Sequence, residues 1–231
     1  VLRGVSFKLS PGQSLALVGA TGSGKTTIVS LICRFYDVQK GQVLIDGVDV
    51  REYRKQDLRA AIAVVLQDVF LFAGSVLENL RLGNESISRE QVIGAARAAG
   101  ADSFISRLDG GFDAQVAERG ATFSTGQKQL IAVARALAYD PRILMLDEAT
   151  ANIDSETEAL LQQGLDKLMT GRTSVAVAHR LSTIRKANLI LVLHKGEVVE
   201  RGTHEELLAL EGCYYKLYKL QFEDEGAAVR M

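Results

Sequence analysis

The chain has 231 residues, of which 47% are hydrophobic and 24% are charged, a balance that excludes a disordered chain and allows a sizeable core. Its formal net charge of −1 excludes a generally basic nucleic-acid binder, so we expect no nucleic-acid partner. Its two cysteines cannot make a disulfide framework, and no stretch approaches the roughly 18 uninterrupted apolar residues of a membrane span. The chain begins inside a predicted strand, so we expect it to be part of a longer protein.

Short apolar runs and capping signals predict alternating strands and helices. We expect strands at residues 1–7, 14–18, 43–47, 61–65, 143–146 and 174–178, and a hairpin at 189–200. We expect helices at residues 26–35, within 86–108, from 124 and from 203. Three of them open with the capping-box pairs Ser88 with Gln91, Ser124 with Gln127, and Thr203 with Glu206. This alternation, with a helical block inserted, favours an α/β fold with a mostly parallel sheet.

A polar or glycine residue follows four of the apolar runs at the same end. Gly19 follows the first, Gln67 the second, Asp147 and Glu148 the third, and His179 the fourth. Ligands of parallel sheets bind outside the carboxyl ends of the strands. The convergence of these residues therefore predicts one active site at that edge of the sheet.

A glycine-rich turn with the pattern G-x-x-x-x-G-K-[ST] joins the strand at 14–18 to the next helix. Its backbone N–H groups and the positive end of the helix suit phosphate oxygens. Lys25 would reach the β- and γ-phosphates, and the Thr26 hydroxyl would ligate Mg²⁺. The alternative, a chance match, is disfavoured by the flanking strand and helix. The expected phosphate-binding residues are Gly19, Ala20, Thr21, Gly22, Ser23, Gly24, Lys25, Thr26 and Thr27.

Two carboxylates follow the strand at 143–146. Asp147 would hold Mg²⁺, directly or through water, and Glu148 would orient and polarise the attacking water. Alone, the pair is more simply interpreted as solvated carboxylates, but the phosphate loop upstream favours catalysis. Gln67 is a candidate ligand of Mg²⁺ or water, and His179 a candidate contact of the γ-phosphate. The expected catalytic residues are Glu148, His179, Lys25 and Gln67, and the expected metal ligands are Thr26, Gln67 and Asp147.

Several motifs, in family order, resemble those of the ATP-binding cassette (ABC) ATPases. Residues 123–127, Phe-Ser-Thr-Gly-Gln, resemble the L-S-G-G-Q signature. Residues 147–154 resemble the Walker B and D-loop run, and residues 178–183 resemble the H-loop. Residues 75–80 and 116–120 resemble two segments typical of exporters, the second being the X-loop that in the family meets the membrane domain.

The resemblance implies a P-loop NTPase with a RecA-like, mostly parallel sheet core, a small antiparallel β subdomain and an inserted α-helical signature subdomain. The core and β subdomain are expected at about residues 1–67 and 141–231, and the helical subdomain at about 68–140. The resemblance also implies an ATP-hydrolysing exporter motor with ATP and Mg²⁺ as cofactors. It would lie on the cytoplasmic face of a membrane, the inner membrane in a bacterium, joined to a transmembrane domain absent from this chain.

In the family, two such domains sandwich two ATP molecules, each site pairing one chain's phosphate loop with the other's signature helix. The resemblance thus places Asp154 at the seam between the chains. Phe123 replaces the usual Leu, and Thr125 replaces the first Gly of the signature. We expect a weakened signature, which slightly favours a heterodimer over a homodimer that tolerates Thr125. The family's adenine-stacking residue would lie upstream of Val1. The residues assigned to the partner's ATP are Ser124, Thr125, Gly126 and Gln127.

Three alternatives stay open at this point. A soluble ABC-type ATPase acting on nucleic acid or ribosomes is disfavoured, because the spacing from Lys25 to Asp147 leaves no room for a coiled-coil arm. A sensor that binds ATP without cleaving it is disfavoured by the presence of Glu148 and His179. An importer ATPase subunit is disfavoured only by the exporter-like segments.

Overall fold

The computed structural model describes residues 1–147, 153–178 and 180–220. The chain divides into two compact units. The first comprises Val1–Ile62, Ile143–Ala149 and Thr173–Met231, and the second comprises Ala63–Arg142 and Thr150–Arg172. The first unit therefore contains the phosphate-loop motif, and the second contains the signature motif.

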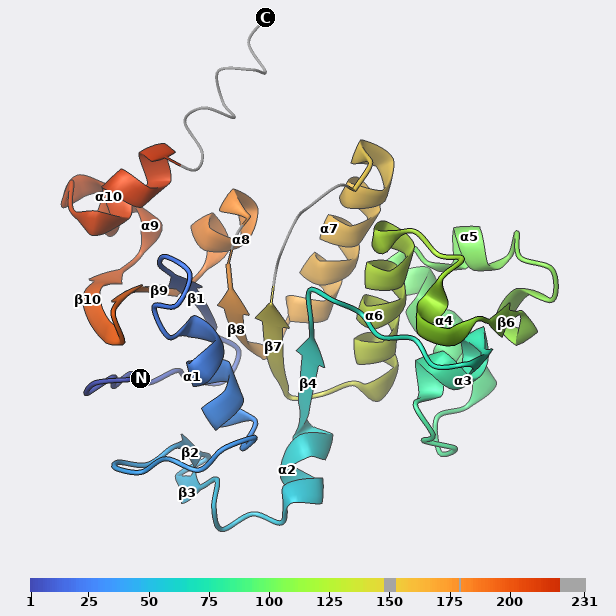
Figure 1. Cartoon of the computed structure of the whole chain (residues 1–231), viewed down its shortest axis with the longest axis horizontal. Coiled ribbons are helices and arrows are strands. Elements are labelled where there is room, and N and C mark those ends of the chain that lie inside the picture. Colours follow the sequence, from blue (N-terminus) through green and yellow to red (C-terminus); the bar gives the residue numbers. More distant parts are fainter. Residues whose placement is uncertain (148–152, 179, 221–231) are drawn as a thin grey trace, which may run out of the picture. The chain divides into compact units, whose positions relative to one another are not determined.

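The largest sheet has six strands in the order β10-β9-β1-β8-β7-β4 (Figure 1). β1 runs parallel to β8 and β9, β7 runs parallel to β8, and β10 runs antiparallel to β9. The predicted mostly parallel sheet is confirmed. The strands are β1 (Ser14–Val18), β4 (Ile62–Val65), β7 (Ile143–Asp147), β8 (Thr173–Val177), β9 (Leu189–His194) and β10 (Glu197–Gly202).

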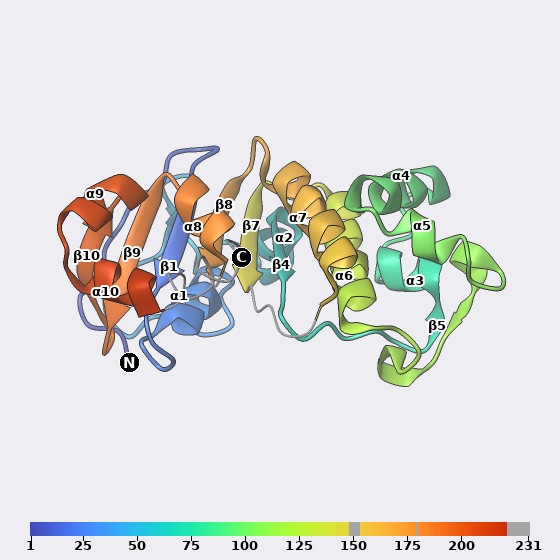
Figure 2. The same cartoon turned by 90° about the horizontal axis from the view of Figure 1, so that it is seen from above.

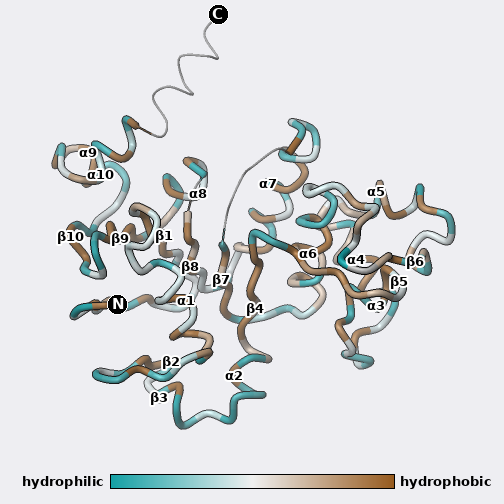
Figure 3. The backbone as a smooth tube through the Cα atoms, viewed as in Figure 1, coloured by the Kyte–Doolittle hydropathy of each residue, from teal (hydrophilic) through white to brown (hydrophobic). Residues whose placement is uncertain are grey.

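In the central strands β1 and β8, four consecutive residues are buried. Because consecutive side chains point to opposite faces of a sheet, both faces of these strands are covered, and their sequences are apolar along nearly the whole length. Figure 3 shows the hydrophobic colour running along β8 and β9. No described helix combines the length and apolar character that crossing a membrane requires. The helices of the first unit are α1 (Lys25–Ile32), α2 (Lys55–Ala61), α8 (Leu181–Lys186), α9 (His204–Ala209) and α10 (Cys213–Tyr218).

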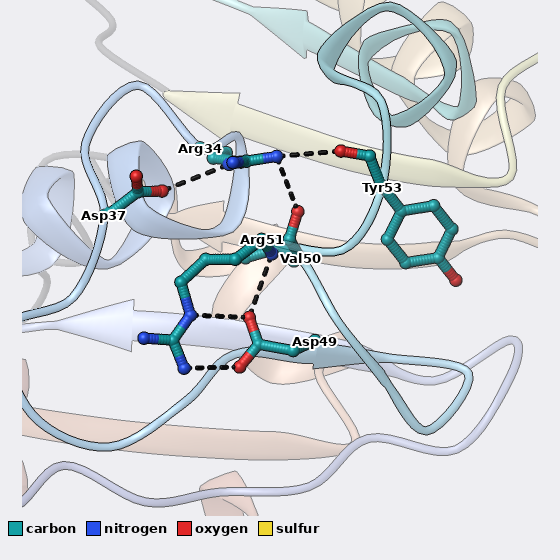
Figure 4. A network of polar contacts seen from close by, with 6 residues as sticks. All are labelled: Arg34, Asp37, Asp49, Val50, Arg51 and Tyr53. Atoms are coloured by element: carbon teal, nitrogen blue, oxygen red, sulfur yellow. Dashed lines mark hydrogen bonds and ion pairs between the residues drawn. The ribbon is translucent and has the colours of Figure 1, made fainter.

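A small hairpin of β2 (Leu44–Ile45) and β3 (Val48–Asp49) is tied to the end of α1 by an arginine (Figure 4). Its turn, Asp46-Gly47, has positive φ at both residues, as a two-residue hairpin turn of this sequence requires. Arg34 follows α1, and its Nη1 donates to the carbonyl oxygens of Val50 and Tyr53 at 3.1 and 2.8 Å. The hairpin is therefore fixed to the helix that follows the phosphate loop.

The second unit is mostly helical, and its two longest helices, α6 and α7, pack side by side with α4 beyond α6 (Figure 2). Gly164 permits close packing, because a Cβ there would lie 3.1 Å from the Ala99 carbonyl oxygen and 3.2 Å from Val133 Cγ1. Two short strands, β5 (Gly74–Ser75) and β6 (Gln115–Val116), pair antiparallel. The helices are α3 (Val76–Arg81), α4 (Arg89–Ala99), α5 (Asp102–Ile105), α6 (Thr125–Tyr139) and α7 (Ser155–Met169), with single turns at Gly111–Asp113 and Glu118–Gly120.

Side chains cap the N-termini of α3, α4, α6, α7 and α9, whereas α1, α2, α5, α8 and α10 have no side-chain cap. All three predicted capping boxes form, at α4, α6 and α9, and a fourth that we did not predict joins Ser75 to Glu78 at α3. The prediction of a strand at residues 1–7 is wrong. Gly4 turns the chain with φ +61°, and Arg3 N donates instead to the Gly196 carbonyl oxygen in the turn between β9 and β10, at 2.8 Å.

Candidate functional site

The phosphate-loop motif connects β1 to α1 and is built around glycines that accept no side chain. A Cβ on Gly19 would lie 2.3 Å from the Leu193 carbonyl oxygen of β9, so the loop backbone rests directly on the neighbouring strand. Gly22 and Gly24 have φ values of +79° and +110°, in the left-handed region that side chains disfavour. Packing therefore requires glycine at position 19, and the backbone conformation favours it at positions 22 and 24.

The N-terminus of α1 is open to an anion. Its N-cap is Gly24, and no side chain caps the helix, whereas side chains of Ser88, Ser124 and Asp154 cap α4, α6 and α7. The first N–H groups of a helix have no partner within the helix and carry its positive dipole end. This arrangement suits the oxygens of a phosphate group.

Lys25 is buried in the loop, with only 7% of its surface exposed. Its Nζ donates to the carbonyl oxygens of Gly19 at 2.6 Å and Ala20 at 3.0 Å. Burial lowers the pKa of Lys25, and the charge of Asp147 partly opposes that shift. The loop thus folds around a buried lysine whose ammonium group is bonded to neutral carbonyls, and phosphate oxygens would be stronger partners for it.

Asp147 ends β7, where it is half-buried and lies in register with Val177 of β8. Since β1, β7 and β8 are parallel, Asp147 and Gly19 lie at the same edge of the sheet. Thr26 is exposed in the first turn of α1. A carboxylate and a hydroxyl are donors that suit Mg²⁺, so these residues fit the predicted metal chemistry.

A buried hydroxyl group in the loop also suits a polar ligand such as a phosphate. Ser23 is 5% exposed, and its Oγ has no hydrogen-bond partner in the described part of the chain. It lies 2.9 Å from the position that a Cβ on Gly19 would take. Buried polar atoms are nearly always paired, so the unpaired Ser23 hydroxyl is consistent with a polar ligand at this loop.

Of the other predicted catalytic residues, only Gln67 lies in the part of the chain that the structure describes. Gln67 is exposed just after β4 and belongs to the second unit. Glu148 and His179 lie outside the described residues, so their predicted roles stay predictions. His204 is buried at the start of α9, with its Nδ1 2.7 Å from the Tyr214 hydroxyl.

The signature motif opens α6. Ser124 is its N-cap, its Oγ accepting from Gln127 N at 3.2 Å while Ser124 N donates to Gln127 Oε1 at 3.0 Å. Thr125 is exposed as the first residue of the helix. Phe123, the other departure from the family pattern, is buried with its ring edge-on to Phe104 at a centroid distance of 6.0 Å.

Gly126 has a structural role that the motif did not indicate. A Cβ there would lie 2.4 Å from Thr157 Cγ2 and 3.1 Å from Ile153 Cγ2, so α6 and the start of α7 are in direct contact. Asp154, predicted to face a partner chain, caps α7 by accepting from Thr157 N at 2.9 Å, and this bond lowers the pKa of Asp154. Its contact with a partner stays a prediction.

Known proteins resemble this chain closely. The profile of a family described as "ABC transporter" matches residues 2–151. The chain is 53% identical over 221 residues to the "Probable multidrug resistance ABC transporter ATP-binding/permease protein YheH" of Bacillus subtilis (strain 168), covering 96% of this chain and 33% of that protein. It is 48% identical over 225 residues to the "ATP-dependent lipid A-core flippase" of Syntrophus aciditrophicus (strain SB), covering 97% and 37%.

A solved structure agrees. "Structure of a bacterial Atm1-family ABC exporter with ATP bound" matches with a TM-score of 0.88 and 41% identity over 96% of this chain and 39% of that one. The chain thus spans about a third of the length of the curated relatives it matches. These matches do not favour the soluble or importer alternatives. With its P-loop NTPase fold, the chain belongs to the ABC transporter family, whose ATP-binding domains are ATPases.

Proposed function

We propose that this chain is the ATP-hydrolysing motor domain of an exporter, closing with a second such domain around two ATP molecules to drive transport. The observation that carries the proposal is the buried Lys25 at the same sheet edge as Asp147, beside a helix N-terminus that no side chain caps. A cation and a carboxylate so placed suit a nucleotide phosphate together with a divalent metal ion. The fused transmembrane parts of the relatives named "ATP-binding/permease" support the coupling to transport.

Each residue has a role in this proposal. The loop of residues 19–27 binds the phosphates, with Lys25 exchanging its carbonyl partners for β- and γ-phosphate oxygens. Thr26, Asp147 and Gln67 are the residues that would hold Mg²⁺, which when bound neutralises phosphate charge. Glu148 orients and polarises the attacking water, and His179 contacts the γ-phosphate. No covalent intermediate is needed, since positioning and charge neutralisation dominate phosphoryl transfer.

We further propose that the signature residues 124–127 bind the ATP held by a partner chain and that Asp154 lies at that seam. The substitution at Thr125 favours a partner with a different sequence. The subdomain boundaries, about 1–67 and 141–231 for the core and 68–140 for the helical part, remain part of this proposal, as does the cytoplasmic face of the membrane.

The proposal is tested on the full-length protein in detergent or lipid by ATP hydrolysis with Mg²⁺. Lys25→Met is expected to abolish ATP binding, because methionine keeps the volume and loses the charge. Glu148→Gln should retain binding and lose phosphate release. Lys40→Met, at an exposed lysine of the same unit, is the matched control and should change neither. A wild-type protein that binds ATP and releases no phosphate would overturn the motor and favour a nucleotide sensor, and phosphate release unaffected by Glu148→Gln would refute the role proposed for Glu148.

Subunit composition needs its own experiment. We expect the full-length protein purified alone to turn over ATP slowly and to gain activity with a partner subunit. Robust basal turnover by the protein alone would contradict the heterodimer and favour a homodimer.

A further inference from the structure

The segment 70–72, which closely follows Gln67, has its backbone held by a buried asparagine. Asn79 of α3 is only 2% exposed. Its Oδ1 accepts from Phe72 N at 2.8 Å, and its Nδ2 donates to the carbonyl oxygens of Phe72 at 2.9 Å and Ser75 at 3.1 Å. A side-chain amide that bonds both the N–H and the C=O of one residue fixes that residue's peptide groups.

An arginine of the signature helix holds the same segment from the other side. Arg135 of α6 donates from Nε to the Asn79 carbonyl oxygen at 2.9 Å. Its Nη1 and Nη2 each lie 3.4 Å from the Phe70 carbonyl oxygen. Burial lowers the pKa of Arg135 to about 10, so the group stays charged at neutral pH. A desolvated guanidinium makes strong bonds to carbonyls and is costly to leave unpaired.

A second residue on the same face of α6 bonds to the turn at Glu118–Gly120. Lys128 precedes Arg135 by seven residues, which places both on one side of the helix. Lys128 Nζ donates to the carbonyl oxygen of Arg119, a residue in the left-handed region with φ 58°. The following Gly120 packs on Leu71, since a Cβ there would lie 2.7 Å from Leu71 Cδ1. Leu71 is fully buried, so both loops and α6 are joined by bonds and packing.

We propose that Arg135 is a positioning residue that makes the segment 67–72 follow the signature helix, so that α6 sets the place of Gln67. From the cap at Ser124 to Arg135 the helix spans about 16 Å, at 1.5 Å per residue. A shift of α6 when its N-terminus meets an anion is thereby carried to the loop of Gln67. The inference rests on the proposed function only for the role of Gln67. The tether, by which we mean the hydrogen bonds of Asn79 and Arg135 to the segment 70–72 and to each other, consists of contacts in the described residues.

The experiment uses the full-length protein with Arg135→Ala, Gln67→Ala and the double variant. Arg135→Ala is expected to speed amide exchange of the peptide covering residues 68–74 at least about tenfold, while the α6 amides keep their protection. Arg135→Ala should also lower kcat about fivefold in the otherwise wild-type protein. When Gln67 is already alanine, adding Arg135→Ala should lower kcat by less than about twofold, because both substitutions disturb the same loop. Arg97→Ala, at an exposed arginine of α4, is the matched control and should change neither readout.

A conservative substitution at the same position provides a second test. Arg135→Lys keeps the charge but not the planar guanidinium group, so it should give the same faster exchange at residues 68–74 and the same loss of kcat as Arg135→Ala. It also replaces the alanine variant if that variant does not fold. Full restoration by lysine, unchanged exchange at 68–74, or losses that multiply in the double variant would overturn the proposal. A wild-type protein without ATP hydrolysis would refute the proposed function, and the exchange experiment would still decide the tether.

Discussion

Two helical glycines should respond in opposite ways to the same substitution. Gly126 lies in the first turn of α6, and its missing side chain leaves room for Thr157 and Ile153. Gly94 lies in the middle of α4, and no atom lies within 4 Å of the position that a Cβ there would take. Alanine at Gly94 is expected to stabilise the chain by about 0.5–1 kcal/mol, since glycine in a helix interior carries that penalty.

Alanine at Gly126 meets a methyl group at 2.4 Å, about 1 Å closer than an ordinary carbon–carbon contact of about 3.5 Å. Overpacking of this kind costs about 1–3 kcal/mol, which exceeds the helix-propensity gain. We therefore expect a net loss of about 1–2 kcal/mol for Gly126→Ala, and a difference of about 1.5–3 kcal/mol from Gly94→Ala.

The assay is urea denaturation of the chain followed by far-ultraviolet circular dichroism, with the slope of the transition checked for each variant. Thr157→Ser removes only the contacted methyl and leaves the next neighbours at 3.1 and 3.3 Å, so adding it to Gly126→Ala should recover most of the loss. If Gly126→Ala is as stable as the parent, or if serine at Thr157 recovers nothing, then the packing argument is wrong.

Two further predictions concern the first unit. Gly19→Ala should abolish nucleotide binding in a titration with ATP and lower the urea midpoint, because the new Cβ would lie 2.3 Å from a strand carbonyl that cannot retreat; undiminished affinity would contradict this. Hydrogen bonds from Arg51 lower the pKa of Asp49 from 3.8 to about 2, so its stabilising effect is present above about pH 4 and lost as pH falls towards 2. Asp49→Asn should therefore flatten the dependence of the urea midpoint on pH between 4 and 2, and an unchanged slope would argue against a role for that carboxylate.

Local features were predictable from sequence because their causes are local. The capping boxes at Ser88, Ser124 and Thr203 each depend on a residue three positions later, and all three form. The phosphate loop was predictable for the same reason, because the glycines that allow its backbone conformation, Gly22 and Gly24 with positive φ, are part of the motif itself. The apolar runs identified the buried strands because both sheet faces are covered.

Features that depend on distant neighbours were not predictable. Gly126 matched the signature, but no pattern indicated that Thr157 fills the space beside it. Nor did the sequence indicate that Arg135 would bond carbonyl groups 56 and 65 residues away along the chain. The strand predicted at residues 1–7 failed for the same reason, because Arg3 pairs with the turn at Gly196.

The N-termini of α1, in the phosphate-loop motif, and of α6, in the signature motif, differ in their capping, and this difference bears on the substitution at Thr125. At α1 no side chain caps the helix, whereas at α6 the Ser124 hydroxyl already accepts from Gln127 N. The N–H groups of Thr125 and Gly126 precede that bond and have no partner within the helix by its geometry. Threonine at position 125 keeps the backbone N–H that glycine would offer and adds bulk beside it. We therefore expect the substitution to hinder the approach of an anion to α6 without removing a donor, and this is the physical reason for predicting a weakened signature.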